Sequence, residues 1–582
     1  MAMIIRFRTK DGMFRVAAES SWTLHQVFDD LSSKIPQCPR YDRVYLGRTP
    51  QDVTESAAPY LESTIEELNF SNGQLLYLKY DTSGGASSST QDSVPTSNPI
   101  SIDSLGIKKL VSAPKSVQQL SVDDFLDSQE GTIPRKRGQF CHHSDRGMCE
   151  YCSPLPPWDN KYKEEHGIKH ISFHAYVKEM NESKNKKNSV GSYISPLVEQ
   201  NYQITSNCPS GHAPWPKGIC SKCQPSAITL QQQKFRLVDH VEFSSSGIIN
   251  DFINCWRLNG CQRIGLLMGT YEVYDKVPLG VKAKVEAIYE MPQLDLEDGL
   301  TYTELNEENE AALKELAENL GLQPVGVVFT DLTDAGLGDG SVICKRHKDS
   351  FFLSSLEIKF AARLQLKYPN ICKWSDSGKF SSKFVTCVVS GNTKGDIDIS
   401  SYQVSQSGEA LVEADLICAS THPDMAIVNK TNEVRYVPDI FFQRINQYGI
   451  QVKVNAKPHF PAEYLLVSLT HGFPTEESQS VSLFSDTSRF PIENREHVGE
   501  SQDWKAIKKA VDFSTHDLHN LRQSLANFHL LLYLSTTGIL SKEELQLLFQ
   551  TVGGKEETRE TSFYKLLESS GFKTLTTIIQ TS

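Results

Sequence analysis

Alternation of apolar and polar residues at the start of the chain predicts two β-strands joined by a turn, within residues 5–16. Apolar residues then recur at helical spacing, and Thr23 with Gln26 forms the capping box that starts a helix. A further strand, Leu75–Tyr80, is predicted after an Asn72-Gly73 turn. A hairpin, a helix and later strands are the plan of a ubiquitin-like β-grasp, which we assign to residues 1–80.

A polar stretch separates this domain from the rest of the chain. Residues 82–100 consist mainly of Ser, Thr, Gly, Asp and Pro. Such a segment cannot bury enough apolar surface to offset its chain entropy. We therefore predict a flexible linker over residues 81–104. Between residues 105 and 135 only Val122–Leu126 is a helix candidate, and the basic trio 135–137 is interpreted as a solvated loop.

Residues 231–490 alternate between helical and strand-like runs, which predicts one large α/β domain around a central sheet. The helical runs are Ile248–Leu258, Glu304–Leu320 and Phe351–Leu364. The strand-like runs are Gly265–Met268, Val281–Tyr289, Val325–Phe329 and Phe384–Val389.

Towards the C-terminus the pattern becomes helical. Helical spacing is kept by Leu518, Leu521, Leu525, Phe528 and Leu532. Ser541 and Glu544 form the capping box of another helix. Residues 491–582 are therefore predicted to be a helical C-terminal domain, and the fold class is multidomain α+β.

Charge and composition favour an intracellular protein. There are 71 acidic against 59 basic side chains, which argues against a protein whose main work is to neutralise nucleic-acid phosphates. No apolar run approaches the roughly 20 residues of a membrane-spanning helix, and Arg6, Arg8 and Lys10 interrupt the apolar residues where a secretory signal would run. The odd number of cysteines, 13, fits metal ligands and buried thiols better than a disulfide framework. The scattered cysteines predicted to be small core residues are Cys38, Cys255, Cys261, Cys344, Cys372, Cys387 and Cys418.

Two short stretches carry nearly the same Cys/His signature. They are Cys141, His143, Cys149 and Cys152, and Cys208, His212, Cys220 and Cys223. Each ends in a Gly-hydrophobe-Cys-x-x-Cys knuckle, a turn that offers two thiolates to one ion. A tetrahedral zinc ion takes four nitrogen or sulfur ligands, so we predict two zinc ions. Because each quartet fills all four positions and leaves none for a catalytic water, both ions are predicted to be structural.

One ligand of the first quartet has competitors. His142 is adjacent to His143, and the choice between them stays open, with His143 preferred. His170 and His174 are alternatives from outside the quartet. They flank Ile171-Ser172-Phe173, which favours an interpretation as strand or core histidines.

The large central domain resembles the MPN fold, which includes metal-dependent deubiquitinases. The resemblance rests on residues 263–269 and 324–332. Catalytic members carry a distant Glu, then His-x-His-Pro, then Ser-x-x-Asp. The corresponding positions here are Gln262, Phe329 and Asp331, and Glu357. A hydrolytic zinc needs its ligands and a base for its water, so the resemblance implies a catalytically inactive domain.

Longer segments resemble the nuclear protein localization protein four family, with a length like that of fungal members. They are Arg146–Trp158, Gly218–Ser226, Phe329–Leu332, Cys344–Ser350 and Asp398–Val404. The resemblance covers essentially the whole chain and is weakest in the linker and near the C-terminus. It places the two zinc motifs in a zinc-binding block over residues 105–230.

The resemblance implies a non-catalytic cofactor of a hexameric AAA segregase, acting as a heterodimer with the ubiquitin-fusion-degradation cofactor. The ubiquitin-like domain would grip the ATPase N-domain, and the zinc loops would rest on the ring above its pore. The central and C-terminal domains would hold polyubiquitin, and a groove would accept an unfolded ubiquitin segment. No cysteine follows Cys418, so the additional C-terminal zinc finger of some animal members is not expected.

The same resemblance implies a place in the cell and a pathway. Clients would be extracted or unfolded in degradation linked to the endoplasmic reticulum and nuclear envelope, and a role in nuclear transport is implied as well. The protein would occur in cytoplasm and nucleus, attached to these membranes only peripherally. Two alternatives remain: an active MPN-type deubiquitinase, and a zinc-dependent nucleic-acid binder, against which the acidic balance counts.

Overall fold

The chain folds as two units, Met1–Val111 and Ser112–Ser582. In the first unit the computed structural model describes residues 2–9, 12–19, 21–32, 44–47, 55–56, 60–65, 67–68, 70 and 74–80. In the second it describes residues 117–138, 140–144, 147–185, 193–205, 208, 210–296, 299–475, 482–485, 489–513 and 517–582. The predicted linker (81–104), the turn at Lys10 and Asp11, Cys38, and Arg146 lie outside the described residues.

A five-stranded sheet packed against one helix makes up the N-terminal unit. Its elements are β1 (Ala2–Thr9), β2 (Gly12–Glu19), α1 (Leu24–Ser32), β3 (Val44–Gly47), β4 (Glu55–Ser56) and β5 (Leu75–Tyr80). The sheet order is β2-β1-β5-β3-β4, with β1 antiparallel to β2 and parallel to β5. The predicted alternation buries Ile5, Phe7 and Val16 in one core with α1. The predicted capping box is confirmed, because Thr23 and Gln26 exchange hydrogen bonds of 3.0 and 3.4 Å.

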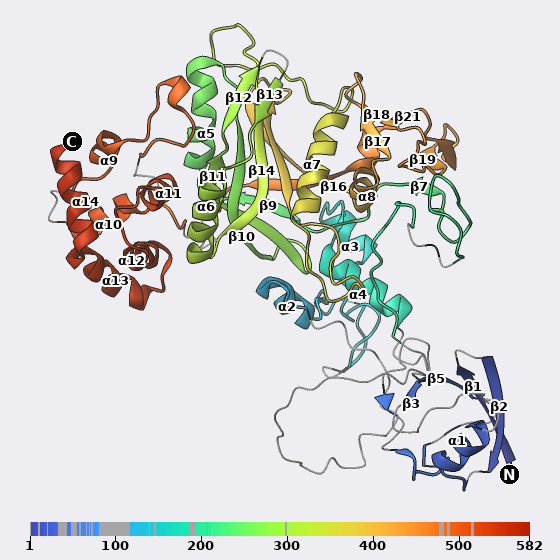
Figure 1. Cartoon of the computed structure of the whole chain (residues 1–582). Coiled ribbons are helices and arrows are strands. Elements are labelled where there is room, and N and C mark those ends of the chain that lie inside the picture. Colours follow the sequence, from blue (N-terminus) through green and yellow to red (C-terminus); the bar gives the residue numbers. More distant parts are fainter. Residues whose placement is uncertain are drawn as a thin grey trace. The chain divides into compact units, whose positions relative to one another are not determined.

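Seven strands of the second unit close into a barrel, in the order β10-β11-β9-β22-β16-β15-β14 (Figure 1). They are β9 (His240–Phe243), β10 (Ile264–Tyr274), β11 (Gly280–Glu290), β14 (Gln323–Asp331), β15 (Val385–Gly391), β16 (Ile397–Val404) and β22 (Leu466–Gly472). All four predicted strand-like runs overlap β10, β11, β14 or β15. The predicted central sheet is thus confirmed, and its closure removes the unpaired edges that an open sheet would expose.

Helices in the segments that connect the barrel strands lie against the barrel. They are α5 (Ser246–Asn259), α6 (Glu307–Leu320), α7 (Ser355–Lys367) and α8 (Gln406–Glu413). Ser245 caps α5, and Gly260 ends it in a left-handed conformation at φ 76°. The prediction for α7 started four residues too early. Ser354 and Glu357 form a capping box that fixes its start at Ser355.

Smaller sheets surround the barrel. Their strands are β6 (Ile171–Ser172), β7 (Ile228–Leu230), β8 (Phe235–Arg236), β12 (Gln293–Leu296), β13 (Gly299–Tyr302), β17 (Ile417–Ala419), β18 (Met425–Val428), β19 (Ile440–Ile445), β20 (Gln451–Asn455) and β21 (His459–Pro461). Nearby helical elements are α2 (Ser121–Ser128), α3 (Asn160–Glu165), α4 (Phe173–Lys184) and η4 (Ala462–Leu465). The predicted helix at Val122–Leu126 is confirmed as α2.

The C-terminal residues form helices that pack beside α6 (Figure 1). They are η5 (Glu496–Val498), α9 (Trp504–Ala510), α10 (Leu518–Leu525), α11 (Phe528–Thr536), α12 (Lys542–Gly553), α13 (Glu556–Glu568) and α14 (Ser570–Thr581). The leucine spacing from Leu518 to Leu532 spans two helices, because Asn527 caps α11 and breaks the run. The capping box of Ser541 and Glu544 is confirmed. These helices share one apolar core with α6, β10 and β14.

Burial supports the interpretation of the scattered cysteines only in part. Cys255, Cys372 and Cys387 are buried, whereas Cys261, Cys344 and Cys418 are half-buried. Among the described residues, none of the helices combines the length and apolarity that crossing a bilayer requires.

Candidate metal centres

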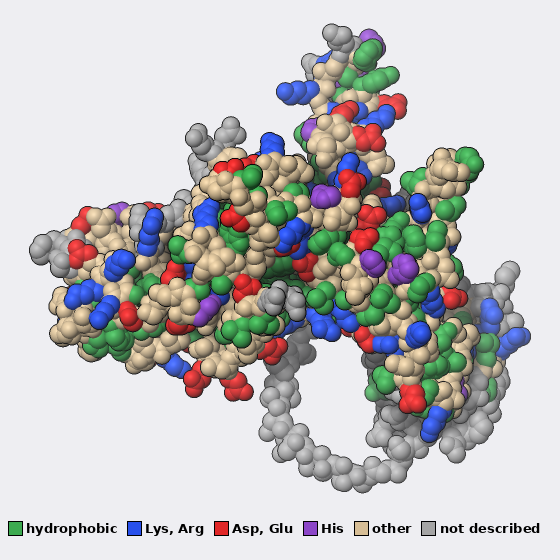
Figure 2. Space-filling view, turned by 90° about the horizontal axis from the view of Figure 1, so that it is seen from above, with side chains coloured by type: hydrophobic (Ala, Val, Ile, Leu, Met, Phe, Trp, Pro, Cys, Tyr) green, Lys and Arg blue, Asp and Glu red, His purple; other side chains and the backbone are tan. Residues whose placement is uncertain are grey.

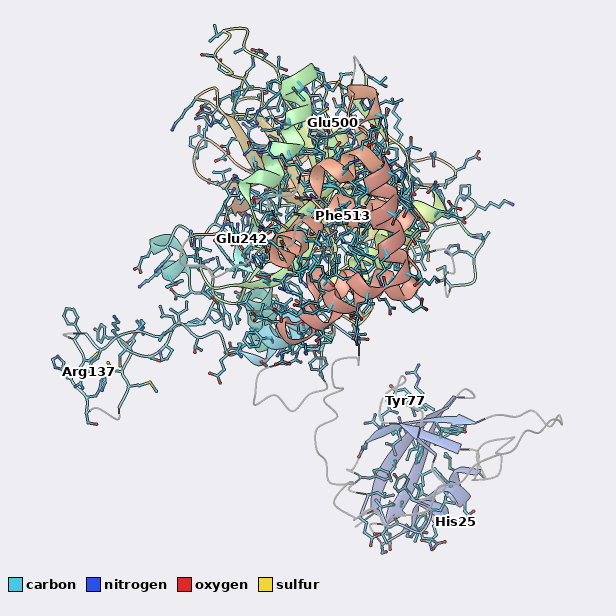
Figure 3. The ribbon with its side chains drawn as sticks, turned by 90° about the vertical axis from the view of Figure 1, so that its left-hand side faces the viewer. His25, Tyr77, Arg137, Glu242, Glu500 and Phe513 are labelled. Carbon is cyan, nitrogen blue, oxygen red and sulfur yellow. The ribbon has the colours of Figure 1, made fainter. Side chains whose placement is uncertain are left out.

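The first Cys/His quartet comes together at the tip of a loop. Cys149 Sγ lies 3.7 Å from Cys141 Sγ and 3.8 Å from Cys152 Sγ, and His143 Nε2 lies 3.1 Å from Cys152 Sγ. All four ligand atoms lie within 4.8 Å of one another. In Figure 3 Arg137 marks this loop, which stands away from the barrel around Glu242.

The second quartet has the same construction. Cys220 Sγ lies 3.4 Å from Cys208 Sγ and 3.8 Å from Cys223 Sγ, while His212 Nε2 lies 3.4 Å from Cys223 Sγ. The four ligand atoms again lie within 4.8 Å of one another. Both quartets therefore present three sulfur atoms and one imidazole nitrogen to a common point.

These distances fit a tetrahedral zinc ion. Sulfur ligands about 2.3 Å from zinc lie about 3.8 Å apart at tetrahedral angles. A disulfide needs sulfur atoms about 2.05 Å apart, so none of these cysteine pairs is one. The protein therefore has two Cys3His clusters suited to two zinc ions, and the predicted zinc cofactor is confirmed at this level.

Backbone groups prepare both clusters for the ion. Nδ1 of His143 lies 2.8 Å from the carbonyl of Ser144, and Nδ1 of His212 lies 2.6 Å from that of Ala213, so each Nδ1–H donates and Nε2 keeps its lone pair. The N–H of Cys149 donates to Cys152 Sγ over 3.3 Å. A backbone hydrogen bond at Lys222 is the largest contribution that lowers the pKa of Cys220 to about 5. The thiolate of Cys220, the form that binds metal, is thus favoured.

The two loops are supported differently. Nε of Arg135 donates to the carbonyl of Ser153 over 2.7 Å, and its guanidinium also contacts that of Glu150, so this arginine braces the first loop from within. The second loop is stabilised by a contact with a residue outside it. The indole N–H of Trp215, in the loop, donates to the carbonyl of Asn432 over 2.9 Å. Arg135 belongs to the trio interpreted from sequence as a solvated loop. Its contacts give it a structural role that charge alone did not suggest.

A glycine ahead of each knuckle packs against the ligand histidine. A Cβ on Gly147 would lie 3.3 Å from His143 Cβ. A Cβ on Gly218 would lie 2.6 Å from the carbonyl oxygen of Ala213 and 2.8 Å from His212 Nδ1. Gly218 is therefore needed for the histidine to reach its place in the second cluster.

Gly218→Ala is expected to weaken zinc binding in the second loop by about 10–100-fold, the usual cost of disturbing the groups that orient a metal ligand. One of the two zinc ions should then pass to a colorimetric chelator faster than in the wild type. Gly138→Ala is the matched control, because, beyond its chain neighbours, no atom of the described residues lies within 4 Å of the added Cβ. Equal release of both ions from the Gly218→Ala variant and the wild type would contradict the role of this glycine.

The other histidines considered from the sequence lie elsewhere. The cluster contains His143, and His142 is exposed. His170 is buried, with Nδ1 3.0 Å from the carbonyl of Gln233. His174 is buried between Asp123 and Asp127. Their interpretation as core histidines is confirmed.

The four residues that the sequence analysis aligned with the catalytic positions of MPN enzymes lie around the end of β14. Gln262 receives hydrogen bonds from the Thr330 hydroxyl (2.7 Å) and the Leu332 N–H (3.1 Å). Phe329 and Asp331 belong to β14, and Glu357 belongs to α7. Asp331 and Glu357 both pair with one guanidinium, that of Arg346.

Positively and negatively charged side chains are mixed on the face of the molecule shown in Figure 2. Across the described residues of that face, Lys and Arg side chains are interspersed with Asp and Glu. Nucleic-acid binding uses a continuous basic stripe or patch, which is a different arrangement.

Comparison with known proteins gives one family throughout. A model of the NPL4 family matches residues 263–580, and a model of the zinc binding region of that family matches residues 117–260. The chain is 49% identical over 584 residues to Nuclear protein localization protein 4 of Saccharomyces cerevisiae and 50% identical over 594 residues to that of Candida glabrata. It is 49% identical over 588 residues to that of Scheffersomyces stipitis. Each alignment covers 100% of this chain and 100% of the relative.

Proposed function

Because the chain belongs to the NPL4 family, we propose that it is a non-catalytic cofactor that delivers polyubiquitinated proteins to a hexameric AAA ATPase. It would act with the ubiquitin-fusion-degradation cofactor as a heterodimer. Its work would be extraction and unfolding of clients in degradation at the endoplasmic reticulum and nuclear envelope, with a further role in nuclear transport. The protein would be present in cytoplasm and nucleus.

The observation that carries this proposal is the pair of closed Cys3His clusters in a chain matched along its full length to this family. We assign the ligands as Cys141, His143, Cys149 and Cys152, and as Cys208, His212, Cys220 and Cys223. Four protein ligands leave no coordination position for a substrate or a water molecule. The ions would therefore hold loop shapes for binding.

Exposed apolar side chains support docking by the first zinc loop. Phe140, Met148 and Tyr151 are 70, 74 and 60% exposed, and the rings of Phe140 and Tyr151 lie 5.7 Å apart. Aromatic and methionine side chains are enriched in protein interfaces. A metal-fixed loop can present them without a core of its own.

The division into domains is proposed on the same basis. Residues 1–80 would be the ubiquitin-like domain, 81–104 a linker, 105–230 the zinc-binding block, 231–490 the MPN-like domain and 491–582 the helical domain. A parallel pairing of β1 with β5 beside the β1–β2 hairpin supports the first assignment. The shared core of α6 and the C-terminal helices implies that the last two domains act as one body.

The central domain would lack deubiquitinase activity. Gln262, Phe329, Asp331 and Glu357 stand where a catalytic member has its metal ligands and base. Phenylalanine cannot bind zinc, and the two carboxylates are already paired with Arg346. Cleavage of a ubiquitin chain by the purified protein, abolished by Glu357→Ala, would overturn this part of the proposal.

The function is tested by binding of the full chain to its two proposed partners. Cys220→Ser should weaken binding to the hexameric ATPase at least about tenfold, or about 1.4 kcal/mol, because the second loop loses its shape. Binding to polyubiquitin should change little, because the barrel and the C-terminal helices, which would hold polyubiquitin, do not contain Cys220. Pull-down and titration against each partner measure both effects.

Cys418→Ser, a change outside both clusters, is the matched control and should leave both interactions intact. Failure of the wild-type chain to bind either partner would reject the proposed function. Equal loss of both interactions in the Cys220→Ser variant would show general unfolding instead.

A further inference from the structure

One guanidinium lies between the two carboxylates at the end of β14. Nε of Arg346 donates to Asp331 Oδ2 over 2.9 Å. Nη1 and Nη2 donate to Glu357 Oε2 and Oε1 over 2.9 and 2.6 Å, a two-bond contact. The Arg346 side chain is only 6% exposed. A single buried cation therefore joins a strand carboxylate to a helix carboxylate.

The surroundings complete this arrangement. Nη1 of Arg346 also donates to the carbonyl of Phe352 over 2.8 Å. The guanidinium carbon lies 5.8 Å from the ring centroid of Phe329 and 5.1 Å from that of Phe351, within the range of cation–π attraction. Phe329 occupies the first histidine position of a catalytic MPN domain. In place of a metal ligand there is an aromatic ring that favours an organic cation.

Charge is balanced at the same place. Nζ of Lys345 lies 2.9 Å from Asp331 Oδ1. Two carboxylates thus face two basic side chains, which together supply the charge of one divalent cation. Burial acts to raise the pKa of Asp331, but Arg346 and Lys345 outweigh it and hold this pKa below its usual value.

We propose that Arg346 takes the position of the metal ion in the degenerate MPN site and thereby excludes divalent cations. Its hydrogen bonds also connect the segment 345–352 to β14 and α7. This inference rests on the proposed function, because the metal position is defined by the MPN correspondence. The central domain would then be inactive for two reasons: Arg346 occupies the metal position, and the histidine ligands are missing. The Ser354–Glu357 capping box shares the same carboxylate, since Glu357 Oε2 also accepts from the Ser354 N–H over 2.7 Å. Loss of Arg346 would therefore disturb the start of α7.

The test uses the full chain with its structural zinc retained and Mn2+ as the probe. Arg346→Met keeps much of the side-chain length but removes the charge, so two half-buried carboxylates lose their shared cation. We expect its melting temperature to fall by about 5 °C or more, and millimolar Mn2+ to recover part of that loss. The wild type should show no shift with Mn2+. The triple variant Arg346→Met/Asp331→Asn/Glu357→Gln should be more stable than the single variant and insensitive to Mn2+.

The control is Arg444→Met, at an exposed arginine of β19, which should melt as the wild type does. A triple variant as unstable as Arg346→Met would show that the arginine acts through packing alone and would overturn the proposal. So would an Arg346→Met variant that Mn2+ does not stabilise. Binding of the wild type to the ATPase and to polyubiquitin is independent of these outcomes, so failure here is distinguishable from failure of the proposed function.

Discussion

Glu290→Ala is expected to lower the free energy of unfolding by about 3–5 kcal/mol, the usual cost of removing one partner of a buried ion pair. Glu290 is fully buried at the end of β11 and accepts hydrogen bonds from two arginines that are themselves 1 and 2% exposed, Arg263 and Arg495. The Arg263 Nε bond is 2.7 Å long and the Arg495 Nε bond 3.2 Å. The alanine variant would leave both guanidinium groups buried without their carboxylate.

The effect should extend to the C-terminal helices. Arg495 also donates from Nη2 to the carbonyl of Asp251 in α5 (3.0 Å), so it links the segment before α9 to the barrel. Urea denaturation measures the loss of stability, and limited proteolysis should show earlier cleavage near residue 495. Glu318→Ala is the matched control, because the Lys314–Glu318 pair is 3.9 Å long and largely exposed, and such pairs contribute at most about 1 kcal/mol. A Glu290→Ala variant as stable as Glu318→Ala would mean that the cluster of Glu290 and its two arginines makes no net contribution to the free energy of unfolding.

Local pattern predicted the elements that depend on neighbours in sequence. The capping boxes at Thr23 and Ser541 were found because their partners lie three residues away. Strand-like runs likewise located β5, most of β11, β14 and β15, and the first part of β10. Closure of the barrel depends on pairing between strands as distant as β9 and β22, and no local pattern records such pairing. The break between α10 and α11 was missed because the leucine spacing continues across Asn527.

The zinc clusters could be predicted because chelation requires particular residue types at short spacings. Their supporting groups could not be, because Arg135 and Gly218 act through backbone geometry and contact with a neighbour. Arg346 was missed for a related reason: its partners Asp331 and Glu357 lie 15 and 11 residues away, and only the fold brings them together. Glu357 was matched to a catalytic position, whereas in the structure it forms a capping box with Ser354.

A second buried cluster depends on pH. The ring of His174 in α4 is 1% exposed and lies between two carboxylates of α2, with Nε2 3.1 Å from Asp123 and Nδ1 3.0 Å from Asp127. Both nitrogens must carry a proton to make these bonds, so the ring is an imidazolium. Opposite α4, Lys383 lies 2.6 Å from Asp123 and Lys373 lies 2.9 Å from Asp127. The cluster therefore joins α2, α4 and the residues before β15.

The directions of the pKa shifts define the pH range in which this cluster stabilises the fold most. Burial acts to lower the pKa of His174, but the two carboxylates outweigh it and raise this pKa above 6.5. Burial acts to raise the pKa values of Asp123 and Asp127, but His174 and the lysines hold both below 3.8. The histidine contribution is complete below about pH 6.5 and is lost as pH rises through the folded pKa, while the aspartate contributions are lost as pH falls below about 3.8. Stabilisation is therefore greatest between about pH 4 and pH 6.5.

His174→Gln is expected to lower the free energy of unfolding by about 3–5 kcal/mol at pH 6, because a neutral amide cannot donate to both carboxylates and leaves their charge uncompensated. The difference from the wild type should shrink at pH 9, where the wild-type imidazolium itself becomes costly to keep. Urea denaturation of both proteins at the two pH values measures this. His422→Gln, at an exposed histidine, should match the wild type at both. If His174→Gln lowered the free energy of unfolding by the same amount at pH 6 and pH 9, the ring would act as a neutral hydrogen-bonding group. Only an ionised ring makes the stability of this cluster depend on pH.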